Sequence, residues 1–225
     1  MARRRGMILA SAVLAFFCVW GILAFQTAPA SAAAAKTGVG LSEHALKAYR
    51  EGWKYQYGAY GQYYNGARRT DCSGLIKSYL WWWGDSGDPQ PGRIAVAGSS
   101  TAMLSSAKQK GSLNLSKAST LPRVQGLILY GPGHVGVYVG GNMEVDNRCT
   151  GQNVKYEKVF GGKYKRWQKW FKLPQLSYPT NGFVTLDGKR YYYENGQYVV
   201  SATRTVSGVA YTFDSKGAVV AAVAA

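Results

Sequence analysis

The sequence predicts an α+β fold, in which helices near the N-terminus pack on an antiparallel sheet formed later in the chain. Before residue 84, apolar residues recur at helical spacing in two segments. From residue 126 onward, short segments with alternating apolar residues predict strands. After residue 180, aromatic segments separated by glycine predict a short C-terminal tail of β-hairpins.

Residues 1–32 have the features of a secretory signal. Arg3–Arg5 precede the apolar run Met7–Phe25, and Ala30–Ala32 supplies a small-residue cleavage site. The run reaches the length of about 20 residues that spans a bilayer, so an uncleaved anchor is the alternative. The alanine-rich stretch that follows favours cleavage. We therefore expect an exported protein with no stable membrane span, whose mature chain opens with a linker at 33–40.

The chain is strongly basic, with a formal net charge of +16. Such a charge attracts polyanions. Export, and the lack of a recognisable binding motif in the sequence, argue against nucleic acid as the partner. Anionic polymers of a bacterial cell wall fit the charge, and plain solubility is the alternative. We expect a secreted, wall-associated bacterial protein.

The first helix is predicted at 42–53, with Ser42 as its N-cap. His44 is expected on the helix surface. A loop rich in glycine and tyrosine is expected at 54–70. The apolar stripe of the helix comprises Leu41, Ala45, Leu46, Tyr49 and Trp53.

The second helix is predicted at 72–83, capped by Thr70 or Asp71. Gly74 lets another segment approach closely, and Leu75, Ile76 and Leu80 bury the helix. Cys72 would stand at the helix start, where the thiol pKa is usually lowered and the thiolate is a nucleophile. A long loop at 84–98 and a short helix at 101–108 follow.

His134 opens a predicted strand and is the candidate base for Cys72. Val135, Val137 and Val139 would face the core, while His134, Gly136 and Tyr138 would share the other face. A Cys–His pair of this kind indicates a cysteine peptidase or amidase. The predicted strands are 126–130, 134–139, 143–147, 153–159 and 166–172.

The turn after this strand decides which acidic residue can orient His134. A two-residue turn would place Met143 and Val145 beside His134, whereas a three-residue turn, Gly140–Asn142, would bring Glu144 and Asp146 there. Polarity favours the second register. We expect Asp146 to orient His134, with Glu144 as the second choice.

Two motifs, Asp71-Cys72-Ser73-Gly74 and Gly133-His134-Val135-Gly136-Val137-Tyr138, resemble the NlpC-type papain-like cell-wall peptidases. The similarity extends from about Trp53 to Pro174. It includes the segments 55–58, 125–127, 146–150 and 167–174.

This resemblance implies cleavage of peptidoglycan stem peptides, commonly at D-γ-glutamyl–diamino acid bonds, through a thioester. Cys72 would be the nucleophile, His134 the base and Asp146 the third polar residue. The expected substrate contacts are Tyr55, Asp71, Ser73 and Glu144. No metal or cofactor is expected, because the chain has few candidate ligands. Cys149 is expected to be a small buried apolar residue.

The predicted organisation is a peptidase domain at 41–174, a linker at 175–180 and two repeats within 181–222. The repeats resemble choline- and glucan-binding wall repeats, although Gly182-Phe183 stands where that family has Gly-Trp. Two units are fewer than such arrays usually need for stability, so we expect them to pack against the main domain or a partner. The alternatives to a stem-peptide hydrolase are an inactive wall-binding protein and a papain-like amidase or transpeptidase.

Overall fold

The computed structural model describes residues 35–83 and 87–225, so the predicted signal at 1–32 lies outside the described residues. Residues Ala35–Ala225 form one compact unit. Among the helices described, none combines the length and the apolar character needed to cross a membrane.

The first helix, α1 (Gly38–Arg50), begins earlier than predicted. Its cap is Thr37, whose hydroxyl accepts a hydrogen bond of 2.9 Å from the Gly40 N–H. The predicted cap, Ser42, is wrong: it lies inside the helix and is fully buried. The predicted stripe holds for Leu41, Ala45, Leu46 and Trp53, which are buried, but not for Tyr49, which is 42% exposed.

His44 also departs from its predicted surface position. Its ring packs against Trp53, Tyr79 and Trp82 at centroid distances of 5.3–5.8 Å. Burial, with a smaller contribution from the charge of Lys47, lowers the pKa of His44 to about 3. The ring is therefore a neutral packing element whose Nε2 shares a 2.7 Å hydrogen bond with the Ser78 hydroxyl.

The segment 54–70 is a small sheet rather than the predicted loop. Its strands are β1 (Lys54–Tyr55), β2 (Tyr60–Tyr64) and β3 (Ala67–Thr70), in the order β1-β3-β2. Asn65 and Gly66 both have positive φ and join β2 to β3. Asn-Gly is the strongest short hairpin signal in a sequence, so this hairpin was predictable.

Two further helices and one short 3-10 helix follow: α2 (Cys72–Trp81), α3 (Ser100–Ser106) and η1 (Ala118–Thr120). The main sheet has six strands in the order β4-β9-β5-β6-β7-β8, and all its pairings are antiparallel. Five strands lie near their predicted positions, while β4 was not predicted. The strands are β4 (Lys110–Ser112), β5 (Leu127–Gly131), β6 (His134–Gly140), β7 (Met143–Asn147), β8 (Val154–Lys158) and β9 (Lys169–Phe171).

The register of β6 and β7 is the predicted one, since Tyr138 pairs with Glu144. The predicted turn is wrong. Gly140 pairs with Met143 across a two-residue turn, and an irregularity between Tyr138 and Gly140 shifts the register by one residue. The turn is one residue shorter than predicted, and the bulge adds one residue to β6. Glu144 therefore still pairs with Tyr138, as predicted.

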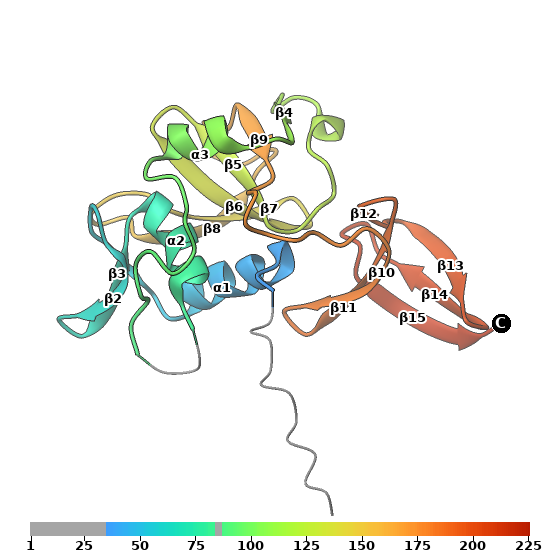
Figure 1. The fold of residues 1–225 in the computed structure, drawn as a ribbon. Helices are drawn as coiled ribbons and strands as arrows, with labels where there is room; N and C mark the ends of the chain where they lie inside the picture. Colours follow the sequence, from blue (N-terminus) through green and yellow to red (C-terminus); the bar gives the residue numbers. More distant parts are fainter. Residues whose placement is uncertain (1–34, 84–86) are drawn as a thin grey trace, which may run out of the picture. The chain divides into compact units, whose positions relative to one another are not determined.

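The core lies where α1 and α2 pack against the central strands β6 and β7. Figure 1 shows both helices beside these strands. Val135 and Val137 are fully buried and join Leu41 and Leu75 in one apolar cluster. The opposite side of β6 is buried as well, so every residue from His134 to Gly140 is shielded from solvent.

Beyond residue 181, the chain forms two three-stranded antiparallel sheets (Figure 1). The first sheet contacts the preceding domain: the Tyr193 hydroxyl accepts from the Gln125 N–H at 3.1 Å, and the Tyr198 hydroxyl accepts from the Gly141 N–H at 3.0 Å. The strands are β10 (Gly182–Leu186), β11 (Lys189–Glu194) and β12 (Gln197–Tyr198), then β13 (Ala202–Val206), β14 (Val209–Phe213) and β15 (Val219–Ala224).

Candidate active site

Cys72 is the first residue of α2 and is half-buried. Asp71 caps this helix: its Oδ1 accepts from the Gly74 N–H at 2.6 Å and from the Ser73 hydroxyl at 3.0 Å. Its Oδ2 accepts from the Gly58 N–H at 2.9 Å. Asp71 and Ser73, both expected to contact substrate, are buried and build the helix start.

Gly74 allows the close approach that the sequence predicted. A Cβ at this position would collide with the backbone carbonyl of Ala59, which lies just before β2. The Asp71 N–H donates a 3.0 Å hydrogen bond to that same carbonyl. Glycine is therefore required for the small sheet to pack against the start of α2, and this packing holds Cys72 in place.

The thiol of Cys72 is not acidified as the sequence suggested. Burial raises its pKa, and the neighbouring charge of Asp71 raises it further. Hydrogen bonds from backbone N–H groups, first that of Val135, act in the opposite direction without overcoming burial. The resting sulfur is a thiol, and nucleophilic attack by it would need a base to remove its proton.

His134 stands at the start of β6, next to Val135, whose backbone N–H lowers the pKa of Cys72. Its Nε2 shares a 2.8 Å hydrogen bond with Asp146 Oδ2. Its ring stacks on Trp167, with centroids 5.6 Å apart and planes at 24°. Because Nε2 is engaged by Asp146, Nδ1 is the nitrogen left to exchange a proton with a nearby group.

Asp146 is fully buried and lies beside Gly136, where an added Cβ would meet the Asp146 Cβ at 3.1 Å. Its carboxylate also accepts from Arg148 Nε, at 2.9 Å to Oδ1 and 3.1 Å to Oδ2. Of the two candidates for orienting His134, Asp146 makes the hydrogen bond to the ring. Among the described residues, no such bond joins His134 to Glu144.

Glu144 is also fully buried, opposite Tyr138. Its Oε1 accepts from Arg148 Nη2 at 3.4 Å, and its Oε2 has no hydrogen-bond partner among the described residues. Burial raises the pKa of this carboxyl well above its ordinary value, and the charge of Asp146 raises it further. Glu144 thus presents no exposed atom to a substrate.

Arg148 is the residue that sequence reasoning missed at this site. Its guanidinium bonds to Asp146, Glu144 and Glu157, and it lies 3.9 Å from the centre of the Tyr164 ring. Alternation places it on the same side of β7 as the two acids. An arginine two residues after Asp146 and four residues after Glu144 is a sequence pattern from which this cluster could be predicted.

Asn147 ties the site to the small sheet. Its Nδ2 donates to the Thr70 hydroxyl at 2.7 Å and to the Thr70 carbonyl at 2.9 Å. Thr70 directly precedes the cap of α2, so this contact fixes β7 relative to the start of the cysteine helix. No role for Asn147 was predicted from its place in the sequence.

Tyr55, the expected border of the cleft, is half-buried on β1. Burial raises the pKa of its phenol, and the charge of Asp71 raises it further. The Tyr55 hydroxyl therefore stays protonated and can donate a hydrogen bond. Its backbone N–H is held by Asn153 Oδ1 at 3.0 Å.

Cys149 is exposed, not buried as expected, and it is a free thiol. In the part of the chain that the structure describes, no group of three or more histidine, cysteine or acidic side chains could hold a metal ion.

A thiol at a helix start, a buried His–Asp pair on adjacent strands and this fold invite comparison with known families. A model of the NlpC/P60 family matches residues 52–172, more than half of the chain. The chain belongs to the NlpC/P60 family. NlpC/P60 proteins are typically cysteine peptidases or amidases of the cell wall, so the family implies peptidoglycan as the substrate. A search of curated proteins found no match.

Proposed function

We propose that this protein is a secreted peptidoglycan hydrolase that cleaves stem peptides at D-γ-glutamyl–diamino acid bonds. The observation that carries the proposal is the 2.8 Å bond between His134 Nε2 and Asp146 Oδ2, beside Val135, whose backbone N–H lowers the pKa of the Cys72 thiol. In this proposal Cys72 is the nucleophile, His134 is the base and Asp146 is the group that orients the base.

The reaction forms and breaks a thioester. Because burial keeps Cys72 protonated, His134 Nδ1 takes the thiol proton as the sulfur attacks the amide carbon. His134 then gives this proton to the leaving amine as the C–N bond breaks. In the second half, His134 takes a proton from water, the resulting hydroxide attacks the thioester, and the thiol is restored as the carboxylic acid leaves.

The negative charge on the tetrahedral intermediate requires donors. The Cys72 backbone N–H at the helix start is one, and the protonated Tyr55 hydroxyl is the second. One such donor is worth about 3–4 kcal/mol in the transition state. Neither donor needs a metal or a cofactor.

The proposal includes export by the segment 1–32 and wall association through the two C-terminal sheets and the positive charge of the exported chain, which is +13 once the three signal arginines are subtracted from +16. An amidase or transpeptidase would use the same three residues on another bond. An inactive wall-binding protein would have no need of the buried His134–Asp146 bond, and this favours the enzyme.

The test is digestion of purified peptidoglycan by residues 33–225, which contain the whole compact unit, with products read by mass spectrometry. Cys72→Ala is the inactive variant, and Cys149→Ala is the matched control because Cys149 is exposed. We expect stem-peptide fragments with the wild type and with Cys149→Ala only. Release of intact stem peptides would indicate an amidase, and intact muropeptides would overturn the enzymatic proposal.

A further inference from the structure

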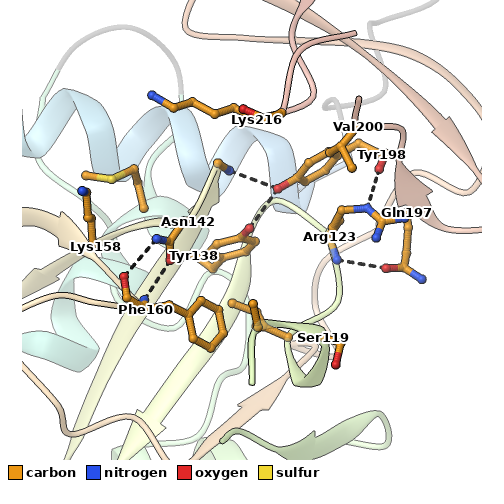
Figure 2. Close-up of a pocket in the computed structure, with 15 residues that line it drawn as sticks. Ser119, Arg123, Tyr138, Asn142, Lys158, Phe160, Gln197, Tyr198, Val200 and Lys216 are labelled. Atoms are coloured by element: carbon orange, nitrogen blue, oxygen red, sulfur yellow. Dashed lines mark hydrogen bonds between the residues drawn. The ribbon is translucent and has the colours of Figure 1, made fainter. Parts of the chain in front are cut away.

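A cavity of about 740 Å³ lies between the catalytic domain and the first C-terminal sheet (Figure 2). Its walls come from η1 and the residues after it, the β6–β7 turn, the end of β8, β12 and the turn before β15. The volume falls in the range of about 300–1,000 Å³ that is typical of small-molecule sites. It is therefore larger than a single inorganic anion requires.

The charged residues of this cavity all have the same sign. Arg123, Lys158 and Lys216 line it, and no aspartate or glutamate of the described chain does. Within the described residues, none of these three cations takes part in an ion pair. Figure 2 shows Arg123 on one side of the two tyrosines and Lys158 and Lys216 on the other. Charges spread in this way suit a ligand with several negative groups.

The walls between the cations are aromatic and held in place. The hydroxyls of Tyr138 and Tyr198 share a 2.8 Å hydrogen bond, and the Tyr198 hydroxyl also accepts from Gly141 (Figure 2). Asn142 is bonded to the backbone of Phe160 in both directions, at 3.0 and 2.8 Å. A site whose walls are fixed before binding loses little entropy when a ligand enters.

The position of Arg123 is fixed as well. Its Nε donates to the Tyr198 carbonyl at 2.9 Å, and its backbone N–H donates to Gln197 Oε1 at 3.1 Å. The two terminal nitrogens of the guanidinium have no hydrogen-bond partner among the described residues, and Arg123 is exposed. These nitrogens are free to bind phosphate or carboxylate in a two-pronged manner.

The cavity is distinct from the candidate active site. None of Cys72, His134 and Asp146 lines it. Tyr138 lies four residues after His134 on β6, which corresponds to roughly 13 Å along a strand. A ligand bound here would contact both the catalytic domain and the C-terminal sheet without occupying the position of the scissile bond.

We propose that this cavity binds a segment of an anionic polyol or sugar chain whose units carry phosphate or carboxylate groups. The separated cations match successive charges of such a chain, and the half-buried ring of Phe160 can pack against its C–H surfaces. The site goes beyond the proposed hydrolysis and does not depend on it. Its effect would be to hold the enzyme on a polyanionic matrix while the active site remains free.

The test uses residues 33–225 in isothermal titration with three oligomers of similar length: glycerol phosphate, galacturonate and neutral glucose. The variant Lys158→Glu with Lys216→Glu reverses two exposed cavity charges. Its control, Lys108→Glu with Lys169→Glu, makes the same change in net charge at exposed positions outside the cavity. We expect the cavity variant to bind an anionic oligomer at least about tenfold more weakly, and the control variant to bind nearly as the wild type does.

Binding of glycerol phosphate alone would identify phosphate as the recognised group, and binding of galacturonate alone would identify carboxylate. Failure of both anionic oligomers to bind, equal binding of the neutral oligomer, or equal losses in the two variants would overturn the proposal. Cleavage of a soluble stem peptide by the cavity variant separates this result from the proposed hydrolysis, since that activity should be unchanged.

Discussion

The Asp146 carboxylate forms hydrogen bonds with two side chains, the His134 ring and the Arg148 guanidinium. One oxygen holds the His134 ring, and both oxygens accept from Arg148, so the guanidinium fixes the carboxylate that orients this ring. Arg148 itself is only 6% exposed in its side chain and is held by Glu144 and Glu157 as well. The orientation of the His134 ring is therefore set by a cluster of charged residues on and next to β7 and β8.

Replacement of Asp146 should lower turnover more than substrate binding. Asp146→Ala removes the acceptor of His134 Nε2, and we expect kcat to fall about 10²-fold, the lower end of the range for acid–base groups. Asp146→Asn keeps an oxygen that can accept this bond and should recover part of the loss. Steady-state kinetics on a soluble stem peptide measure kcat and KM separately. Full activity of Asp146→Ala would contradict this assignment.

Glu144 makes stability depend on pH. Burial raises the pKa of its carboxyl in the folded state, so its stabilising contribution is complete below the unfolded pKa and is lost as pH rises through the folded value. Glu144→Gln, which cannot ionise, should therefore melt a few degrees above the wild type near pH 8. The difference in melting temperature should vanish below about pH 4, where the Glu144 carboxyl is protonated in both the folded and the unfolded state.

Melting temperatures at pH 4 and pH 8 test this expectation. Glu157→Gln is the control, because Glu157 also pairs with Arg148 but its side chain is 33% exposed. Equal stabilisation in both variants, or a Glu144→Gln protein less stable than the wild type at pH 8, would contradict the account.

At the scale of elements, the helix that carries Cys72 and the strand that carries His134 could be predicted from the sequence. Asp71 before an apolar helical run and strict alternation after His134 are local signals. The register of β7 could also be predicted from polarity, although the turn that produces it was not. A bulge depends on the backbone of both strands, so a pattern in one strand does not reveal it.

Other features depended on contacts between distant segments. The raised pKa of Cys72 arises from burial, which could not be predicted because the residues next to the cysteine in the sequence are polar. The exposure of Cys149 and the packing of His44 among aromatic rings follow from the arrangement of segments far apart in the chain. The Asn65-Gly66 hairpin, in contrast, depends on a local signal and could be predicted from the sequence.

Gly74→Ala tests the packing at the start of α2. The new Cβ would collide with the Ala59 carbonyl, and overpacking of this kind typically costs about 1–3 kcal/mol. We expect lower stability in urea denaturation together with reduced activity, because the shift displaces Cys72. Gly98→Ala is the control, since nothing lies within 4 Å of a Cβ there. Equal stability of the two variants would show that α2 does not need this close approach.

At the scale of the whole molecule, the first C-terminal sheet is joined to the catalytic domain through buried tyrosines. Tyr198 bonds to Tyr138 and Gly141, and Tyr193 bonds to Gln125. Arg50 and Asp187 add an ion pair of 2.6 Å between half-exposed side chains, which contributes little to stability. The tyrosine contacts should therefore make the domain and the sheet unfold together.

Tyr198→Phe should destabilise the whole unit by about 1–3 kcal/mol, because the Gly141 N–H and the Tyr138 hydroxyl lose their shared partner. Tyr211→Phe is the matched control, since its hydroxyl makes no hydrogen bond within the described residues. Calorimetry should show a single transition that shifts in Tyr198→Phe only. Two separate transitions in the wild type would mean that the sheet and the domain unfold independently.

The most direct test of the central claim is to trap the covalent intermediate. Residues 33–225 are mixed with a soluble stem peptide, quenched in acid within one turnover and digested for mass spectrometry. We predict an acyl adduct, with loss of the leaving amine, on the fragment that contains Cys72, and more of it in Asp146→Ala if deacylation slows more than acylation. Cleavage without any adduct on Cys72, or an adduct on Cys149 alone, would contradict the thioester mechanism and the role of Cys72.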